Sequence, residues 1–398
     1  MPVRLDQYNY PQPNNYPSPP PPPPRLGVRE TTRNLGLYNP YLDTGKKKSS
    51  FAWALVWLVF AVIGLTVVGL MVLGVGLGGA IVGTLAAIIP ACFYLSLFLW
   101  LDRYDPEPPG KLVFAFAWGA VIAIFISIIA NGIVGYLFGD AMALTVSAPV
   151  FEEGSKGLGV LIIVLFFRAD FDSVVDGIVY AGVVALGFAT VENIQYYGAS
   201  MVRGGGGALI QTLFVRGVLS PYAHVLFTCM TGIGFGVARE THNKALKIAA
   251  PVIGYSSAVF LHSLWNSMAA LGGGKYFLVA YVLIEAPMFL IFLSVIIYLV
   301  YREGQILKRA LIVEVNRGLI TQIQLDTAIS VFRRTGWVAS AIGNSRLYSA
   351  RRQFLRSVAK LGLCHWHVQR AAQAGGETQS FPLISQFQAE VFSLRDKV

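Results

Sequence analysis

Apolar positions in this chain come in long unbroken runs, without the regular polar interruptions of a soluble helix or strand. A run of about 20 apolar residues is long enough to cross the bilayer as a helix. We expect about eight such spans, near residues 51–74, 79–101, 111–138, 143–167, 176–199, 218–238, 246–270 and 276–301. The pattern therefore predicts an all-α fold, a polytopic membrane helical bundle of about eight transmembrane helices.

The regions on either side of the apolar runs differ from them and from each other. Residues 1–50 are polar and include the run Pro19–Pro24, a composition that favours extended conformations and cannot build a packed core. We interpret them as a disordered cytoplasmic tail that acts as a spacer or binds an adaptor through its prolines. Residues 302–398 are rich in Arg with apolar positions at helical spacing, which predicts a small basic helical region in the cytoplasm. Residues 51–301 form the transmembrane domain.

The positive charge follows the loops and tails. The chain has 31 Lys and Arg against 21 Asp and Glu, a net charge of +10, but these residues do not gather on a polar surface with interleaved aromatics. This distribution excludes a nucleic-acid partner and fits the positive-inside rule with a lipid bilayer as the partner. Lys46–Lys48 directly precede the first run, so we place the N-terminus in the cytoplasm, and an even number of spans returns the C-terminus there. Arg203 and Arg216, on the expected outer side, are exceptions.

The overall composition supports the membrane assignment. Hydrophobic residues make up 55% of the chain and charged residues only 13%, against the quarter expected of a soluble domain. The three cysteines lie far apart, which excludes a disulfide framework or a CxxC metal site. Cys364, His365 and His367 lie close in sequence, but we expect them on an ordinary helix face.

Several ionisable side chains lie inside the predicted spans, where each costs a few kcal/mol and needs an explanation. They occur in the fourth to eighth spans, as Glu152, Glu153, Lys156, Glu192, His224, His262 and Glu285, with Asn266 one turn after His262. At about 1.5 Å per residue, Glu153 lies roughly 15 Å from the outer end of its span, Glu192 and His224 roughly 10 Å, and His262 roughly 12 Å. We therefore predict that they converge in the outer half of the membrane.

Each of these residues also has a plainer interpretation. Glu152 and Lys156 are four residues apart and could form an ion pair along one helix face. A single histidine could bond a neighbouring helix without further function. Glu285 stands beside Pro287 without a partner motif, which favours a structural or lipid-facing position.

Taken together, the set matches the needs of peptide hydrolysis. Cleavage requires an activated water, a donor for the oxyanion and an acid for the leaving amine. A buried glutamate could serve as base while histidine and asparagine hold the oxyanion. Alternatively, two imidazoles and one carboxylate could bind zinc or another divalent metal, with a second glutamate as base, although no HExxH motif is present. Both mechanisms draw on the same candidate catalytic residues, Glu152, Glu153, Glu192, His224, His262 and Asn266, with Lys156 in support.

Five short motifs, in this order along the chain, resemble the PrsW family of intramembrane proteases, a relative of the CAAX-processing and bacteriocin-immunity proteases. They are the loop Asp102–Pro108, the Glu-Glu-x-x-Lys of Glu152–Lys156, the segment Gly187–Asn193, the segment His224–Gly232, and His262-x-x-x-Asn266. The resemblance covers roughly residues 98–300.

The resemblance implies a peptidase of the bacterial plasma membrane that cleaves a membrane protein of the anti-sigma-factor type. Carried over by position, Glu152 or Glu153 would activate water, while Glu192, His224 and His262 would bind metal or the oxyanion. Asn266 departs from members that carry an acidic residue there, which leaves its role open. Two other functions fit the residues alone. A proton-coupled transporter would use the same buried carboxylates and histidines, and a non-catalytic scaffold would tolerate Glu153→Ala.

Overall fold

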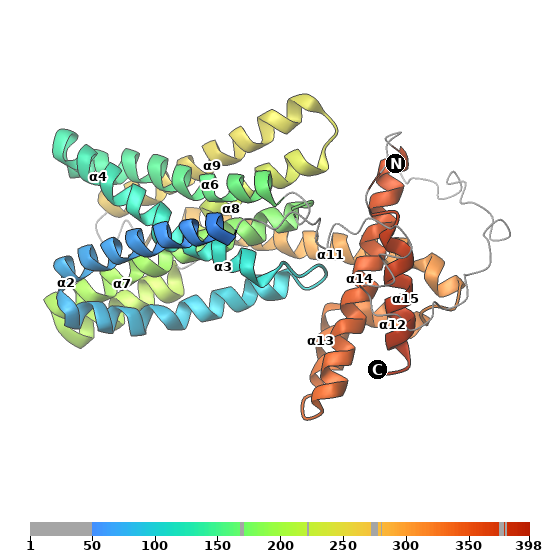
Figure 1. Ribbon diagram of the computed structural model, residues 1–398. Helices are drawn as coiled ribbons and strands as arrows, with labels where there is room; N and C mark the ends of the chain where they lie inside the picture. Colours follow the sequence, from blue (N-terminus) through green and yellow to red (C-terminus); the bar gives the residue numbers. More distant parts are fainter. Residues whose placement is uncertain are drawn as a thin grey trace.

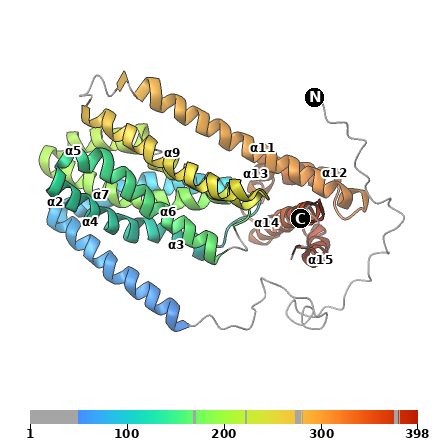
Figure 2. The ribbon, with the colours of Figure 1, turned by 90° about the horizontal axis from the view of Figure 1, so that it is seen from above.

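The computed structural model describes residues 50–398 except 168–170, 221–222, 272–277, 280, 374–377 and 379. The predicted Pro-rich tail therefore lies, apart from Ser50, outside the described residues. Within the described part the chain forms helices and no strand, which confirms the all-α prediction. Figures 1 and 2 show a bundle of long helices with a second group of helices at one end.

The first helix folds back on itself. Helix α2 (Ser50–Leu101) has 52 residues and breaks at Gly76, whose φ of 72° lies in the left-handed region that glycine adopts without strain. A straight helix of that length would measure about 78 Å, far more than the 30 Å of the hydrocarbon core. Figure 1 shows its two arms running in opposite directions.

A second unit combines α-helical and π-helical turns. It consists of α3 (Pro109–Ala117), η3 (Trp118–Ala123) and α4 (Ile124–Phe138), which follow one another without a break. The chain then passes through α5 (Asp140–Met142) and the π-helix η4 (Ala143–Ser147) into α6 (Ala148–Phe166). The single-turn π segments are of the kind often found at functional sites.

Helix α7 (Val174–Phe214) is the buried centre of the bundle. Its N-cap is Ser173, whose side chain accepts a hydrogen bond from the Asp176 backbone N–H in a capping box. The helix bends at Gly205. Its residues from Val174 to Ala189 are all buried. The chain continues through η5 (Val215–Leu219) and α8 (Ala223–Glu240), which pack beside it, to α9 (Lys244–Leu271), which packs against α8 and α6.

Among the described residues, five helical stretches are long and apolar enough to cross a membrane. They are Trp53–Leu101, Pro109–Phe138, Val174–Glu240, Lys244–Ala270 and Tyr281–Asn316. Some of these contain more than one predicted span, because α2 and the stretch from α7 to α8 each include a break. The α6 helix is also apolar but carries Glu152, Glu153 and Lys156.

The C-terminal helices have their own apolar core. Helix α11 (Ala286–Asn316) follows η6 (Tyr281–Glu285) and runs without a break from the bundle into this region, so the boundary expected near residue 301 falls inside it. Its Leu307 and Leu311 pack with buried residues of α12 (Gln322–Ile329), α14 (Ser345–Gln373) and α15 (Leu383–Arg395). Helix α13 (Val331–Ala339) joins this group to the bundle, because Arg334 donates to the Arg103 carbonyl at 2.7 Å.

Candidate active site

Helix α6 carries the two adjacent glutamates into the centre of the bundle. Successive helical residues point about 100° apart, so the two carboxylates meet different neighbours. Glu152 is 7% exposed and Glu153 is fully buried. Lys156, one turn further along, is fully buried too. Three ionisable side chains on one short helix can be kept away from solvent only if their charges and hydrogen bonds are satisfied locally.

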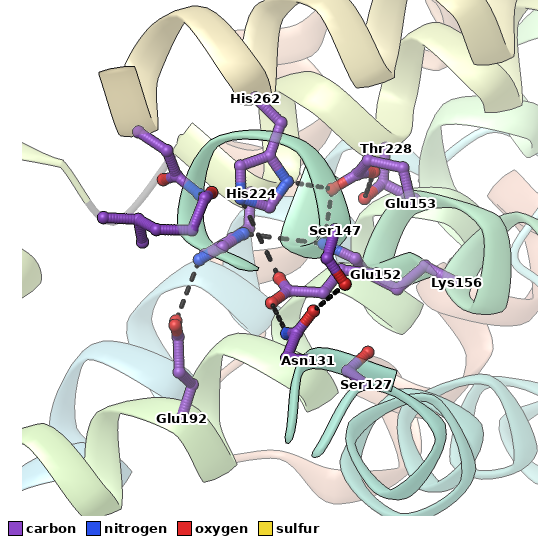
Figure 3. A network of polar contacts seen from close by, with 12 residues as sticks. Ser127, Asn131, Ser147, Glu152, Glu153, Lys156, Glu192, His224, Thr228 and His262 are labelled. Carbon is purple, nitrogen blue, oxygen red and sulfur yellow. Dashed lines mark hydrogen bonds and ion pairs between the residues drawn. The ribbon is translucent and has the colours of Figure 1, made fainter. Parts of the chain in front are cut away.

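Of the two carboxylates, Glu153 is the one whose two oxygens both contact polar side chains (Figure 3). One of its oxygens contacts Lys156 Nζ and lies 3.0 Å from His262 Nδ1 on α9. The other accepts a hydrogen bond of 2.8 Å from the Thr228 hydroxyl on α8. Lys156 therefore pairs with Glu153, three residues before it, whereas the plainer interpretation of the sequence pairs it with Glu152, four residues before it.

His224 joins this cluster to Glu192. Its Nε2 lies 2.9 Å from Glu192 Oε2 on α7, and its Nδ1 lies 3.5 Å from Lys156 Nζ. The ring of His224 meets the ring of His262 edge to face, with centroids 5.1 Å apart. Carboxylates from two helices and imidazoles from two more therefore surround one centre, as the depth argument predicts.

Arg216 is a member of the site that the sequence analysis missed. Its guanidinium contacts Glu192 Oε2, donates to Asn193 Oδ1 at 2.7 Å, and lies 3.8 Å from the centre of the Tyr196 ring. The signal was present in the sequence, because this arginine violates the positive-inside rule. A cation on the expected outer side needs a counter-charge, and the carboxylate of Glu192 supplies it.

Glu152 retains an oxygen without a partner. Its Oε1 accepts from Asn131 Nδ2 at 3.2 Å, and Asn131 in turn accepts from the Ser147 hydroxyl at 2.8 Å. Among the described residues, the other oxygen, Oε2, is buried and has no hydrogen-bond partner. It lies 3.8 Å from His262 Nε2, the ring nitrogen that Glu153 does not contact. The polar character of Asn131 within an apolar run was the only sequence signal for its role.

The donor set fits a metal ion. Ligand atoms of Glu152, His224 and His262 lie within 4.8 Å of one another. Two ligands of one tetrahedral zinc ion, each about 2.0 to 2.1 Å from the metal, are about 3.3 Å apart, so zinc binding would draw these ligand atoms together by up to about 1.5 Å. The carboxylate that completes the group is that of Glu152, not Glu192 as we predict, because Glu192 is engaged by His224 and Arg216.

Asn266, the last residue of the predicted catalytic set, makes a different contact. Its amide donates to the Leu144 carbonyl of η4 at 2.8 Å. This bond ties α9 to η4 and uses the amide that would otherwise hold an oxyanion.

Two further sequence predictions concern polar residues outside the catalytic set. Glu285 is 2% exposed, so the lipid-facing alternative is wrong. In the C-terminal helices, His365 contacts Glu314, His367 contacts Ser380, and Cys364 belongs to the apolar core. The three side chains thus have separate partners.

Comparison with known proteins places this site in a family. Residues 107–295 match the family described as PrsW family intramembrane metalloprotease. A "Protease PrsW" of Bacillus subtilis (strain 168) is 34% identical over 164 residues, which cover 40% of this chain and 70% of that protein. The chain belongs to the PrsW family. This confirms the resemblance seen in the sequence motifs.

Other PrsW relatives show how far the likeness extends. A "Protease PrsW" of Geobacillus kaustophilus (strain HTA426) is 35% identical over 162 residues, and the match spans 39% of this chain and 65% of that relative, just under two thirds. One of Clostridioides difficile (strain 630) is 29% identical over 187 residues, covering 46% and 76%. No solved structure matches the chain. The region matched to the PrsW family contains every residue of the site, whereas α12 to α15 lie outside it.

Proposed function

We propose that this PrsW family member is a protease of the bacterial plasma membrane that hydrolyses a peptide bond of a membrane protein. The observation that carries the proposal is the buried group of Glu152, His224 and His262 with Glu153 beside it. The unpartnered Oε2 of Glu152 is the strongest element of that group, because a buried carboxylate oxygen without a donor costs free energy unless a ligand engages it.

Each residue has a role in this proposal. Glu152, His224 and His262 would hold a divalent metal such as zinc, which polarises water and the scissile carbonyl when bound. Glu192 accepts the Nε2 proton of His224 and so leaves Nδ1 as the ligand atom. Glu153 orients His262 through Nδ1 and takes the proton of the attacking water.

The same residues support a mechanism without metal. In that case one of the two glutamates activates water directly and His224 stabilises the oxyanion. Lys156 supports both versions, because its ammonium balances the buried charge of Glu153. The two versions differ in their response to a chelator.

The proposed topology has eight spans with both termini in the cytoplasm. The two arms of α2 give two spans, and α3 to α4, α6, α7, α8, α9 and α11 give the other six. The basic C-terminal helices then lie on the cytoplasmic side, in keeping with the positive-inside rule. This arrangement puts the site in the outer half of the membrane, where a single-pass protein of the anti-sigma-factor type could be cleaved on its outer side.

Co-expression with tagged single-pass membrane proteins tests this function. The wild type should release a fragment from at least one of them, and Glu153→Gln should not. Glu390→Gln, at an exposed position of α15, is the matched control and should cleave normally. Equal fragmentation by the wild type and Glu153→Gln would show that this site does not perform the cleavage.

The metal is tested on purified protein. We expect close to one bound zinc per chain by elemental analysis, a loss of that zinc in Glu152→Gln, and loss of cleavage in a chelator. Cleavage that persists in the chelator, by protein without metal, would support the glutamate mechanism instead.

A further inference from the structure

Several pairs of neighbouring helices in the bundle meet through glycines at backbone contact. A Cβ atom built on Gly177 of α7 would lie 2.2 Å from the Gly232 carbonyl oxygen of α8. One built on Gly254 of α9 would lie 2.4 Å from the Met230 oxygen of α8, and one on Gly83 of α2 would lie 2.1 Å from the Ile194 oxygen of α7. Helices this close leave no room between them, so these contacts are closed.

The seam between α6 and α9 is built differently. Its glycine on α6, Gly154, faces the side chain of Tyr255, and a Cβ there would meet the Tyr255 hydroxyl at an ordinary 3.4 Å. A groove of about 500 Å³ runs along this seam, lined by Val150, Tyr255, Ser256, Val259, Phe260 and Ser263. Its outer rim faces the surroundings, because Phe260 is 65% and Val150 is 36% exposed.

Three hydrogen bonds from α9 side chains to backbone carbonyls bridge this seam. Tyr255 donates to the Val150 carbonyl at 3.1 Å, Ser263 to Thr145 at 2.6 Å, and Asn266 to Leu144 at 2.8 Å. Bonds of this kind between membrane helices are individually weak and exchange easily for other donors. Two of the three acceptors belong to the π-helix η4, an element typical of functional regions.

The groove lies about one helical turn from the candidate active site. Residues three apart on a helix lie on nearly the same face. Val150 is three residues before Glu153 on α6, and Val259 is three residues before His262 on α9. Glu153 and His262 are 3.0 Å apart and buried behind this groove, whose outer rim is apolar, and neither residue lines it.

We propose that the seam between α6 and α9 is the lateral entrance through which the apolar transmembrane segment of a substrate reaches Glu153 and His262. This rests on the proposed protease function. A helix with its side chains is about 10 Å wide, so a groove of this volume admits side chains only and the seam must widen. The apolar lining suits a lipid-embedded helix, and the hydroxyls of Tyr255, Ser256 and Ser263 suit the exposed backbone of its unwound cleavage site.

Photo-cross-linking tests which surface the substrate touches. A benzoylphenylalanine replaces Phe260 in the groove or, as the control, Phe93 on α2, which is similarly exposed at 58%. Both chains carry Glu153→Gln so that bound substrate is not cleaved, and the probe is a tagged single-pass protein that the wild type cleaves. We expect at least fivefold more cross-linked tag from position 260. Equal or stronger cross-linking from position 93 overturns the entrance.

A distance measurement tests the seam without any substrate. Spin labels are placed at Leu158 on α6 and Ile253 on α9, both lipid-exposed, after the exposed Cys92 is replaced by Ser. Tyr255→Phe with Ser263→Ala should lengthen and broaden the distance distribution between the labels. An unchanged distribution overturns the proposal that these bonds hold the seam.

The control for the distance measurement is Thr66→Ala. Among the described residues, the Thr66 hydroxyl bonds only to the Val62 carbonyl of its own helix, so this change should leave the distribution as it is. The two proposals can fail separately. A widened seam without any cleavage counts against the protease, whereas cleavage with equal cross-linking from both positions counts against the entrance alone.

Discussion

Removing one hydroxyl, in Thr228→Val, should slow cleavage without disturbing the packing of the bundle. Thr228 and Glu153 are both fully buried, and the Thr228 hydroxyl is the donor to Glu153 Oε2 at 2.8 Å. Valine has nearly the same shape, so the substitution removes the donor and leaves no cavity. Lys156 and His262 still contact the other oxygen, Oε1, which keeps the carboxylate in place. Oε2 then lacks the hydrogen bond from Thr228.

The magnitude follows from the charge on the acceptor. A hydrogen bond to a charged group contributes about 1.5 to 3 kcal/mol, and about 1.4 kcal/mol corresponds to a factor of ten in rate. If Glu153 needs this bond to be correctly oriented, kcat/KM should fall by about 10- to 150-fold by the same conversion. The assay is the rate of fragment release from a tagged single-pass substrate in proteoliposomes. Thr228→Ser keeps the hydroxyl and should retain most of the activity.

Thr231→Val is the matched control for this prediction. Thr231 lies three residues further along α8 and is also buried, but among the described residues its hydroxyl has no hydrogen-bond partner. Its replacement should therefore leave kcat/KM within about twofold, since no bond is lost. A similar loss of activity in both variants would mean that the packing of these two threonine side chains on α8 controls activity. The hydrogen bond from Thr228 to Glu153 would then have no catalytic role of its own.

Three further predictions concern the surroundings of the site. Arg216→Gln removes the guanidinium contact with Glu192 and should lower kcat/KM by about 10- to 100-fold. The control is Arg203→Gln, at an exposed position, which should leave kcat/KM unchanged. Equal effects of the two substitutions would contradict this prediction. Burial raises the pKa of Asp102 from 3.8 to about 8, so the folded protein keeps a proton that the unfolded chain releases. Thermal stability in detergent should therefore fall as pH rises from about 4 to about 8, and Asp102→Asn should flatten that slope; parallel profiles would contradict this. A Cβ on Gly232 would lie 2.1 Å from a backbone oxygen of α7, whereas one on Gly132 meets nothing within 4 Å. Gly232→Ala should thus lower the melting temperature by several degrees and Gly132→Ala should not.

The sequence predicted which helices contribute to the site but not how their side chains pair. Apolar runs reveal spans, and the depth of Glu153, Glu192, His224 and His262 along them correctly predicted a common layer. The rotation of each helix about its axis decides which side chains face one another. Packing against neighbouring helices sets that rotation, and the hydrophobic pattern of the sequence does not reveal it. For this reason the ion pair considered for Lys156 from the sequence was with Glu152, whereas the structure pairs it with Glu153.

The composition of the metal group depended on a residue from another segment. Glu192 was the carboxylate ligand that the family resemblance implied. The structure engages it with Arg216, from the π-helix η5, and the carboxylate left without a partner is Glu152. Arg216 reaches Glu192 because α7 breaks at Gly205 and the chain after the break turns back toward the first part of that helix. A hydropathy pattern carries no information on such a turn.

The unbroken course of α11 decides how the protein can be shortened. A truncation at residue 302, where the hydropathy falls, would cut this helix in the middle. It would remove Leu307 and Leu311, against which the buried residues of the C-terminal helices pack. The loop after α2 would also lose its cover, because Tyr104, now 2% exposed, donates its hydroxyl to the Ile329 carbonyl. A preparation trimmed to the region shared with its relatives would expose newly uncovered apolar surface to water, so purification and reconstitution call for a chain that retains α12 to α15.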